Sequence, residues 1–172
     1  MKNDKITSIH IGEFFVTGEP STLVVHGLGS CVALILFDEE NSLGGLAHVL
    51  LPGPRPESAT MSDMPAKYGD EALGRMVEAL MEKGGKRENL RAALVGGARL
   101  FSAEQDVDNE VGPRNVRAMR FFIKENGIPV MAEEVGGKVG RSVYFTLPSC
   151  RLEVKTLREG KREIAFSSGA GG

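Results

Sequence analysis

The sequence predicts an α+β fold built on mixed β-sheets, and three features of the 172-residue chain indicate it. Segments typical of strands come in runs rather than in strict alternation with helices, which disfavours a doubly wound parallel sheet. Only two long stretches have the apolar spacing of a helix. The apolar content of 41% and the charged content of 26% are those of an ordinary globular protein. We expect about eight or nine strands and two main helices.

The first half of the chain predicts extended segments at residues 6–16, 22–26, 32–37 and 44–51. The second is β-branched and is interrupted by Gly27 and Gly29. The third is continuously apolar, as in a strand that is buried on both faces. Polar residues 38–42 then mark a turn, so the third and fourth segments are expected to pair as a hairpin.

The second half predicts two helices after a proline-rich loop over residues 52–67. The first helix has one apolar stripe over residues 72–81, and the second begins near Pro113 and ends at Gly127. Further strands are expected at residues 90–95, 128–133, 143–145, 152–157 and 164–166. We expect one domain over residues 1–166 and a flexible tail over residues 167–172.

Composition excludes several classes of function. The chain has 21 Lys and Arg against 23 Asp and Glu, so no basic field favours nucleic acid. Two cysteines suit a reducing compartment, and the first ten residues lack the apolar core of a signal peptide. The longest apolar run is too short to insert in a membrane. We therefore expect a cytoplasmic protein, and the absence of metal-spaced ligands or nucleotide motifs predicts no cofactor.

The most informative segment is Gly27-Leu28-Gly29-Ser30-Cys31-Val32, in which a cysteine follows a glycine-rich bend. The glycines leave backbone amides unshielded, and amides beside a nucleophile can form an oxyanion hole. The alternative is a small buried cysteine at the start of a strand, which this segment alone favours.

His48 lies in the otherwise apolar segment 44–51 and is either a buried core residue or a catalytic base. If the hairpin turn centres between Glu40 and Asn41, His48 lies opposite Ala33. Cys31 is then two positions away on the same face, within reach of the imidazole. Such a neighbour can lower the pKa of a thiol and activate it.

Other candidates are weaker. His26 adjoins the glycine bend and can approach the site, although packing or exposure explains it equally well. His10 and Cys150 are expected to have no catalytic role. Arg114 and Asn115, at the start of the second helix, can bind an anion or substrate, but such residues more often cap a helix end.

Several motifs together resemble the CheD family of chemoreceptor glutamine deamidases. They are the Cys31 segment, Gly45-Leu46-Ala47-His48-Val49-Leu50-Leu51-Pro52, Lys67-Tyr68-Gly69-Asp70, Gly96-Gly97-Ala98-Arg99-Leu100-Phe101, Gly112-Pro113-Arg114-Asn115-Val116, Glu134-Val135-Gly136-Gly137 and Gly140-Arg141-Ser142-Val143. The resemblance implies the cysteine-hydrolase fold of cytotoxic necrotizing factor toxins, a layered α/β/β/α sandwich. It implies a protein-glutamine glutaminase that converts chemoreceptor glutamines to glutamates, and a CheC-type phosphatase as a possible partner.

The resemblance also implies site residues. It places the nucleophile at Cys31 and the histidine at His48. From the glycine-rich bend itself we expect the backbone amides of Ser30 and Cys31 to be the oxyanion donors. The family has a threonine six residues before the cysteine, where this chain has Val25. A valine side chain accepts no hydrogen bond, so we expect the Val25 backbone carbonyl, or a nearby group, to orient His48. That departure also supports an alternative, a binding module for receptors or a phosphatase with little catalysis, for which Phe101 is a candidate contact.

Overall fold

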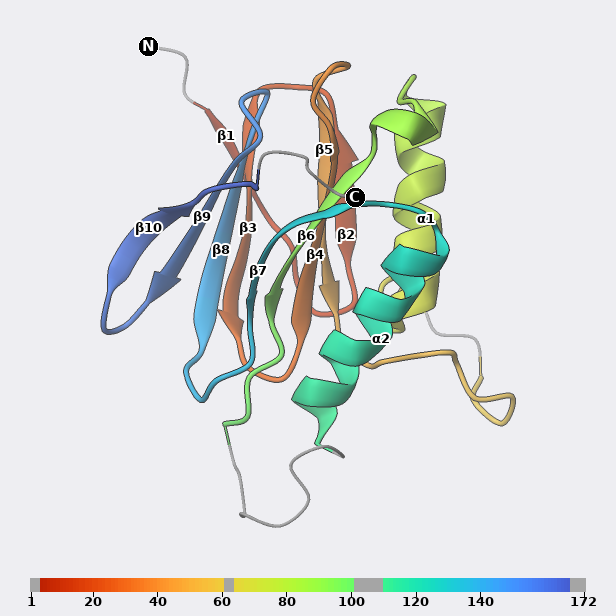
Figure 1. Ribbon diagram of the computed structural model, residues 1–172, viewed down its shortest axis with the longest axis vertical. Coiled ribbons are helices and arrows are strands. Elements are labelled where there is room, and N and C mark those ends of the chain that lie inside the picture. Colours follow the sequence, from red (N-terminus) through yellow and green to blue (C-terminus); the bar gives the residue numbers. More distant parts are fainter. Residues whose placement is uncertain (1–3, 61–63, 101–109, 168–172) are drawn as a thin grey trace.

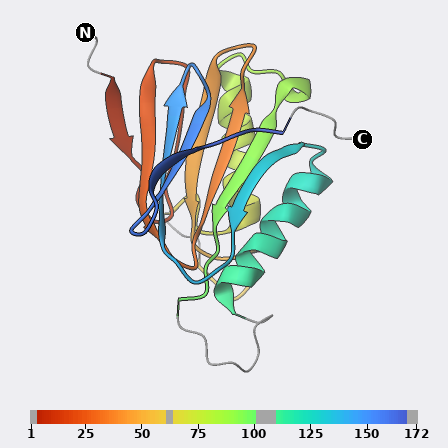
Figure 2. The same cartoon turned by 60° about the vertical axis from the view of Figure 1, so that its left-hand side comes forward.

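The computed structural model describes residues 4–60, 64–100 and 110–167. These residues form two five-stranded sheets that pack face to face, with two α-helices against the outer face of one of them (Figures 1 and 2). The strand order is β1-β3-β8-β9-β10 in the first sheet and β2-β5-β4-β6-β7 in the second. The pairs β1–β3 and β6–β7 are parallel and the others antiparallel, so both sheets are mixed.

The strands and helices follow one another along the chain with short connections except around the undescribed segments. The strands are β1 Lys5–Ser8, β2 Phe14–Thr17, β3 Ser21–Leu28, β4 Val32–Asp38, β5 Leu43–Val49, β6 Arg91–Gly96, β7 Val130–Val135, β8 Arg141–Leu147, β9 Arg151–Thr156 and β10 Gly160–Ile164. The α-helices are α1 Gly69–Glu82 and α2 Val111–Glu125, and a short 3₁₀ helix spans Arg87–Asn89.

Strand β4 explains the two-layered core. It is the central strand of its sheet, and all seven of its residues are buried. Val32, Leu34 and Leu36 belong to the cluster beneath the helices, whereas Ala33 and Ile35 belong to the cluster between the sheets. Because successive side chains point to opposite faces, a strand covered on both sides must be apolar throughout.

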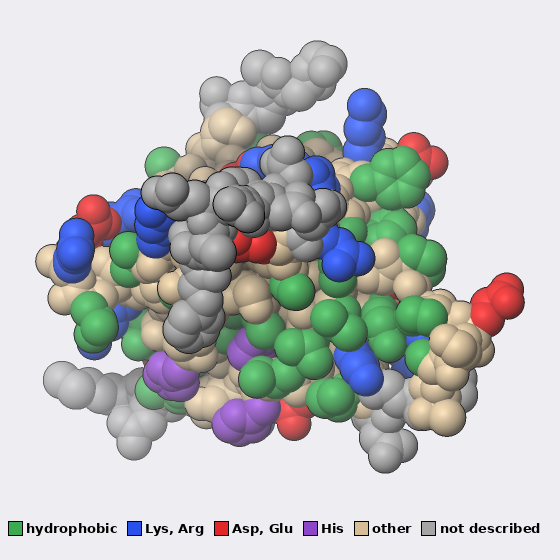
Figure 3. All heavy atoms as spheres, turned by 90° about the horizontal axis from the view of Figure 1, so that it is seen from below, with side chains coloured by type: hydrophobic (Ala, Val, Ile, Leu, Met, Phe, Trp, Pro, Cys, Tyr) green, Lys and Arg blue, Asp and Glu red, His purple; other side chains and the backbone are tan. Residues whose placement is uncertain are grey.

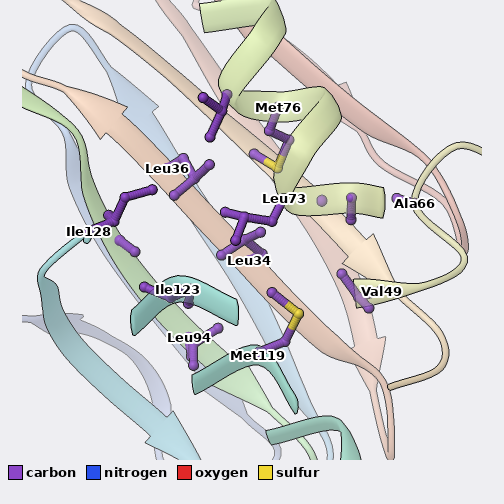
Figure 4. Packing of buried hydrophobic residues seen from close by; sticks show 14 of the residues in the cluster. Leu34, Leu36, Val49, Ala66, Leu73, Met76, Leu94, Met119, Ile123 and Ile128 are labelled. Carbon is purple, nitrogen blue, oxygen red and sulfur yellow. The ribbon is translucent and has the colours of Figure 1, made fainter. Parts of the chain in front are cut away.

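The helices cover only the sheet that contains β4. Figure 4 shows Leu73 and Met76 of α1 and Met119 and Ile123 of α2 packed over that sheet. Each helix presents one apolar stripe to it, which is the amphipathic pattern that the sequence indicates. Among the described elements, none covers the outer face of the first sheet (Figure 1).

The expected α+β class with two mixed sheets is confirmed, and so are both predicted helices. Two details differ. The described layers run β/β/α, without the second helical layer of the expected α/β/β/α sandwich. The extended segment 6–16 is also not one strand, because β1 joins the first sheet and β2 the second. A bend between them crosses from one sheet to the other and forms a wall of the site described next.

Candidate active site

Cys31 lies where the chain passes from the first sheet to the second. Strand β3 ends with a bulge between Val25 and Leu28, and Gly27 has φ +65°, a left-handed conformation that glycine adopts without strain. Cys31 directly precedes β4 and is 8% exposed. The predicted glycine-rich bend therefore delivers the thiol to the end of the interface between the two sheets.

His48 has the register that the sequence predicts. On the antiparallel pair β4–β5 it lies opposite Ala33, two residues beyond Cys31. The turn that fixes this register is held by the buried carboxylate of Asp38. It accepts hydrogen bonds from the backbone N–H of Asn41 at 3.1 Å, the Asn41 amide at 2.7 Å and the backbone N–H of Lys86 at 2.9 Å. These bonds hold the pKa of Asp38 below its ordinary value despite the opposing effect of burial.

Cys31 and His48 line the same cavity, which has a volume of about 280 Å³. Its remaining walls come from the bend after β1 and from the end of β3, and consist of Ser8, Ile9, His10, Ile11, His26 and Gly27. The cavity thus contains all three histidines of the chain. Figure 3, viewed from below, shows histidine side chains gathered at this end of the molecule. We expected no role for His10 and left His26 open, yet both border the site.

The protonation states differ from the sequence-based expectation. Burial raises the pKa of the Cys31 thiol above its ordinary 9.0, although the residue's own backbone N–H opposes this effect. Burial is also the largest influence on His48 and lowers the pKa of its imidazole below 6.5. The expectation that the histidine lowers the thiol pKa is therefore wrong for the resting protein. Both groups are neutral near pH 7, because burial disfavours the charged form of each.

Three nearby groups act against or with burial on the pKa of the His48 imidazole. The backbone of Ile9 and the charge of Glu13 raise this pKa and so favour the protonated ring, whereas the charge of His10 lowers it. The ring Nδ1 is buried without a formed hydrogen bond among the described residues. Val25 is fully buried in the cluster between the sheets. A main-chain carbonyl has no sequence signature, so sequence reasoning did not find Ile9.

The peptide units around Cys31 are held by the residues that directly follow the neighbouring strand β6. The backbone N–H of Gly97 donates to the Cys31 carbonyl at 2.9 Å, and that of Ala98 donates to the Gly29 carbonyl at 2.9 Å. Gly96 has φ +109°, and a Cβ at this position would overlap the Cys31 carbonyl oxygen. This glycine is thus required both by its backbone conformation and by the close approach of the nucleophile's loop.

The other predicted site residues lie outside this cavity. Ser30 lines a neighbouring cavity of about 360 Å³ beside the start of α2. Cys150 is buried elsewhere in the cluster between the sheets, and burial raises its pKa to about 12. Phe101 lies outside the described residues. Within the described ranges, no group of three or more His, Cys, Asp or Glu suits a metal ion. No helix in this part of the chain is long and apolar enough to cross a membrane.

A thiol and an imidazole that face one cavity at strand ends form the pairing used by cysteine hydrolases. In an α+β protein of two packed mixed sheets, this pair defines a candidate thiol-dependent hydrolase. A family model described as CheD chemotactic sensory transduction matches residues 50–156. Relatives that are 35% identical over 92% of this chain show the same membership, and the chain belongs to the CheD family.

Three relatives illustrate this membership, and each bears the name chemoreceptor glutamine deamidase CheD. That of Halalkalibacterium halodurans is 35% identical, covering 92% of this chain and 98% of the relative. That of Bacillus subtilis is 35% identical over 92% and 96%, and that of Thermotoga maritima is 38% identical over 90% and 94%. A solved structure, the Bacillus licheniformis hypothetical protein YfiH, has a TM-score of 0.44 and 17% identity over 78% of this chain and 60% of that one.

Proposed function

We propose that the protein is a chemoreceptor glutamine deamidase in which Cys31 is the nucleophile and His48 the acid–base group. The family membership supports the reaction, because the relatives carry that name. The observation that carries the assignment of residues is the shared cavity, which brings this thiol and this imidazole together from two paired strands. Cys150 does not line that cavity, and burial raises the pKa of its thiol to about 12.

The reaction begins with both groups neutral. His48 accepts the thiol proton as Sγ of Cys31 attacks the side-chain carbonyl carbon of glutamine, so no free thiolate accumulates. The carbonyl oxygen becomes an oxyanion near the backbone N–H groups of Ser30 and Cys31. When the intermediate collapses, protonated His48 gives its proton to the leaving nitrogen. Ammonia departs and a thioester remains on Sγ.

The second half of the reaction restores the enzyme. Neutral His48 accepts a proton from a water molecule as the water oxygen attacks the thioester carbon. The carbon–sulfur bond then breaks, the proton passes to Sγ, and the product is the carboxylic acid of glutamate. Protonated His48 forms in both halves, and the Ile9 backbone stabilises that form. Ile9 is therefore our candidate for the nearby backbone group that orients His48, beside the Val25 carbonyl.

A second cleft gives room for the chain that flanks the target glutamine. It has a volume of about 480 Å³ and shares His26 and Gly27 with the catalytic cavity. Beyond these residues it is lined by Arg141, Tyr144 and Lys155, among others. A protein substrate can therefore place one side chain in the cavity while its neighbours lie along the outer face of the first sheet.

The test compares Cys31→Ala with Cys150→Ala on a receptor fragment, read by released ammonia and by the mass change at each glutamine. Cys31→Ala is expected to abolish deamidation, and Cys150→Ala to leave the rate per folded molecule within about twofold. The reverse pattern would remove Cys31 as the nucleophile. A natural protein that releases no ammonia from any receptor fragment, at the level of Cys31→Ala, would favour the binding-module alternative.

A CheC-type phosphatase partner, a contact role for Phe101, a cytoplasmic location and the absence of nucleic-acid binding stay predictions. So do the domain limits at residues 1–166.

A further inference from the structure

Asn115 is a buried polar residue that the mechanism above does not use. It lies in the second turn of α2, within the helical layer, and is fully buried. Its side-chain nitrogen donates two hydrogen bonds, one to the Ser30 carbonyl at 2.9 Å and one to the Leu50 carbonyl at 3.1 Å. Ser30 directly precedes the thiol, and Leu50 follows His48 by two residues. One amide group therefore joins the two segments that carry the candidate catalytic pair.

The sequence builds this contact through close packing at the start of α2. A Cβ on Gly112 would overlap the Ala98 carbonyl oxygen, and a Cβ on Gly97 would overlap the side chain of Val116. Because neither residue has a side chain, the first turn of the helix can contact the turn after β6 directly. That approach brings Asn115 within hydrogen-bond distance of the Cys31 loop.

Three consecutive carbonyls of the loop are then held from other segments. The backbone N–H of Ala98 donates to the Gly29 carbonyl, and the backbone N–H of Gly97 donates to the Cys31 carbonyl. Between them, the side-chain amide of Asn115 donates to the Ser30 carbonyl. In a trans peptide the carbonyl of one residue points opposite to the N–H of the next. Anchoring the Ser30 carbonyl on Asn115 therefore directs the N–H of Cys31 away from the helix. That N–H acts on the residue's own sulfur and donates no backbone hydrogen bond among the described residues.

We propose that Asn115 is a positioning residue that aims the Cys31 backbone N–H at the oxyanion, while its second bond keeps the His48 strand in register with the nucleophile. The inference rests on the proposed function, because it assigns the donor that stabilises the tetrahedral intermediate. The side-chain oxygen Oδ1 of Asn115 is buried without a hydrogen-bond partner in the described part of the chain. The two donated bonds are thus the side chain's only polar contacts in those ranges, and both are directed at the site.

The test replaces the donor nitrogen by oxygen in Asn115→Asp, which keeps the size of the side chain but leaves no amide to donate. Two activities of the same protein are measured per folded molecule. Deamidation of a receptor fragment requires the oxyanion to be stabilised. Alkylation of Cys31 by iodoacetamide requires only an accessible thiol, because displacement of iodide forms no oxyanion. We expect kcat for deamidation to fall about 10- to 100-fold, with KM and the alkylation rate within about twofold.

Met119→Ala is the matched control. Met119 is one turn further along the same buried face of α2 and belongs to the core beneath the helices. This substitution is expected to lower the unfolding temperature and to leave kcat unchanged. If Asn115→Asp folds too poorly to assay, Asn115→Ala removes the same donors without adding a carboxylate.

The outcomes separate the two proposals. A folded Asn115 variant with kcat within about threefold of the natural protein would overturn the inference while leaving the deamidase function intact. Equal losses of deamidation, alkylation and stability, as for any core variant, would also overturn it. Absence of deamidation in the natural protein itself would instead refute the proposed function.

Discussion

Replacing Gly96 by alanine should displace the loop that carries Cys31 without removing the thiol or the imidazole. Gly96 has φ +109°, which strains any residue with a Cβ by about 1–3 kcal/mol. The added methyl group would also overlap the Cys31 carbonyl oxygen. Ordinary contact begins at 3.4 Å, so the two atoms must move apart by about 1 Å. A misplacement of that size at a reacting group lowers the rate by about 100-fold.

Gly127→Ala is the control for backbone strain alone. Gly127 follows α2 with φ +68°, and a Cβ there would meet no atom within 4 Å. Both variants should lower the free energy of unfolding, measured by urea denaturation, by at least about 1 kcal/mol. Only Gly96→Ala should lower kcat for deamidation, measured as ammonia release per folded molecule. A Gly96→Ala protein with full kcat would refute the reasoning that the β6 end positions Cys31.

Three further predictions follow from the site. Iodoacetamide at about pH 8 should label Cys31 well before Cys150, because a pKa of about 12 leaves about one Cys150 thiol in ten thousand ionised; labelling of Cys150 first in peptide maps would contradict this. The deamidation kcat/KM should stay level from neutral to mildly alkaline pH and fall in the acid range as His48, whose pKa burial lowers, becomes protonated; a decline on the alkaline side of neutral would instead indicate a preformed thiolate–imidazolium pair. Val25→Thr should change kcat by at most about tenfold, since the backbone of Ile9 already favours the protonated ring; turnover gained only in that variant would show that the natural protein is inactive.

The strand pairing of the site could be predicted from the sequence because side-chain alternation constrains it. The apolar run of β4, the polar turn around Asp38 and the segment containing His48 allow one register in which a small residue faces the histidine. Ala33 is that residue, and the structure confirms the pairing. Cys31 directly precedes β4 and is two residues from the position opposite His48, and both residues line one cavity.

The supporting contacts could not be predicted, for two physical reasons. Ile9 acts through its backbone, and any residue at that position offers the same carbonyl. Asn115 is distant in sequence from Ser30, and at the start of a helix an asparagine more often caps. The protonation states of Cys31 and His48 depend on how completely two sheets bury them, which spacing along the chain does not report.

The central claim is that the glutamine side chain becomes a thioester on Sγ of Cys31, and an acid quench during turnover tests it directly. The protein is mixed with an excess of receptor fragment, quenched in acid within the first turnovers, digested and mapped by mass spectrometry. The account predicts a cross-linked peptide that joins the Cys31 segment to a receptor glutamine with loss of ammonia, sensitive to hydroxylamine as thioesters are. Turnover without any adduct on that peptide, or an adduct on Cys150, would contradict it.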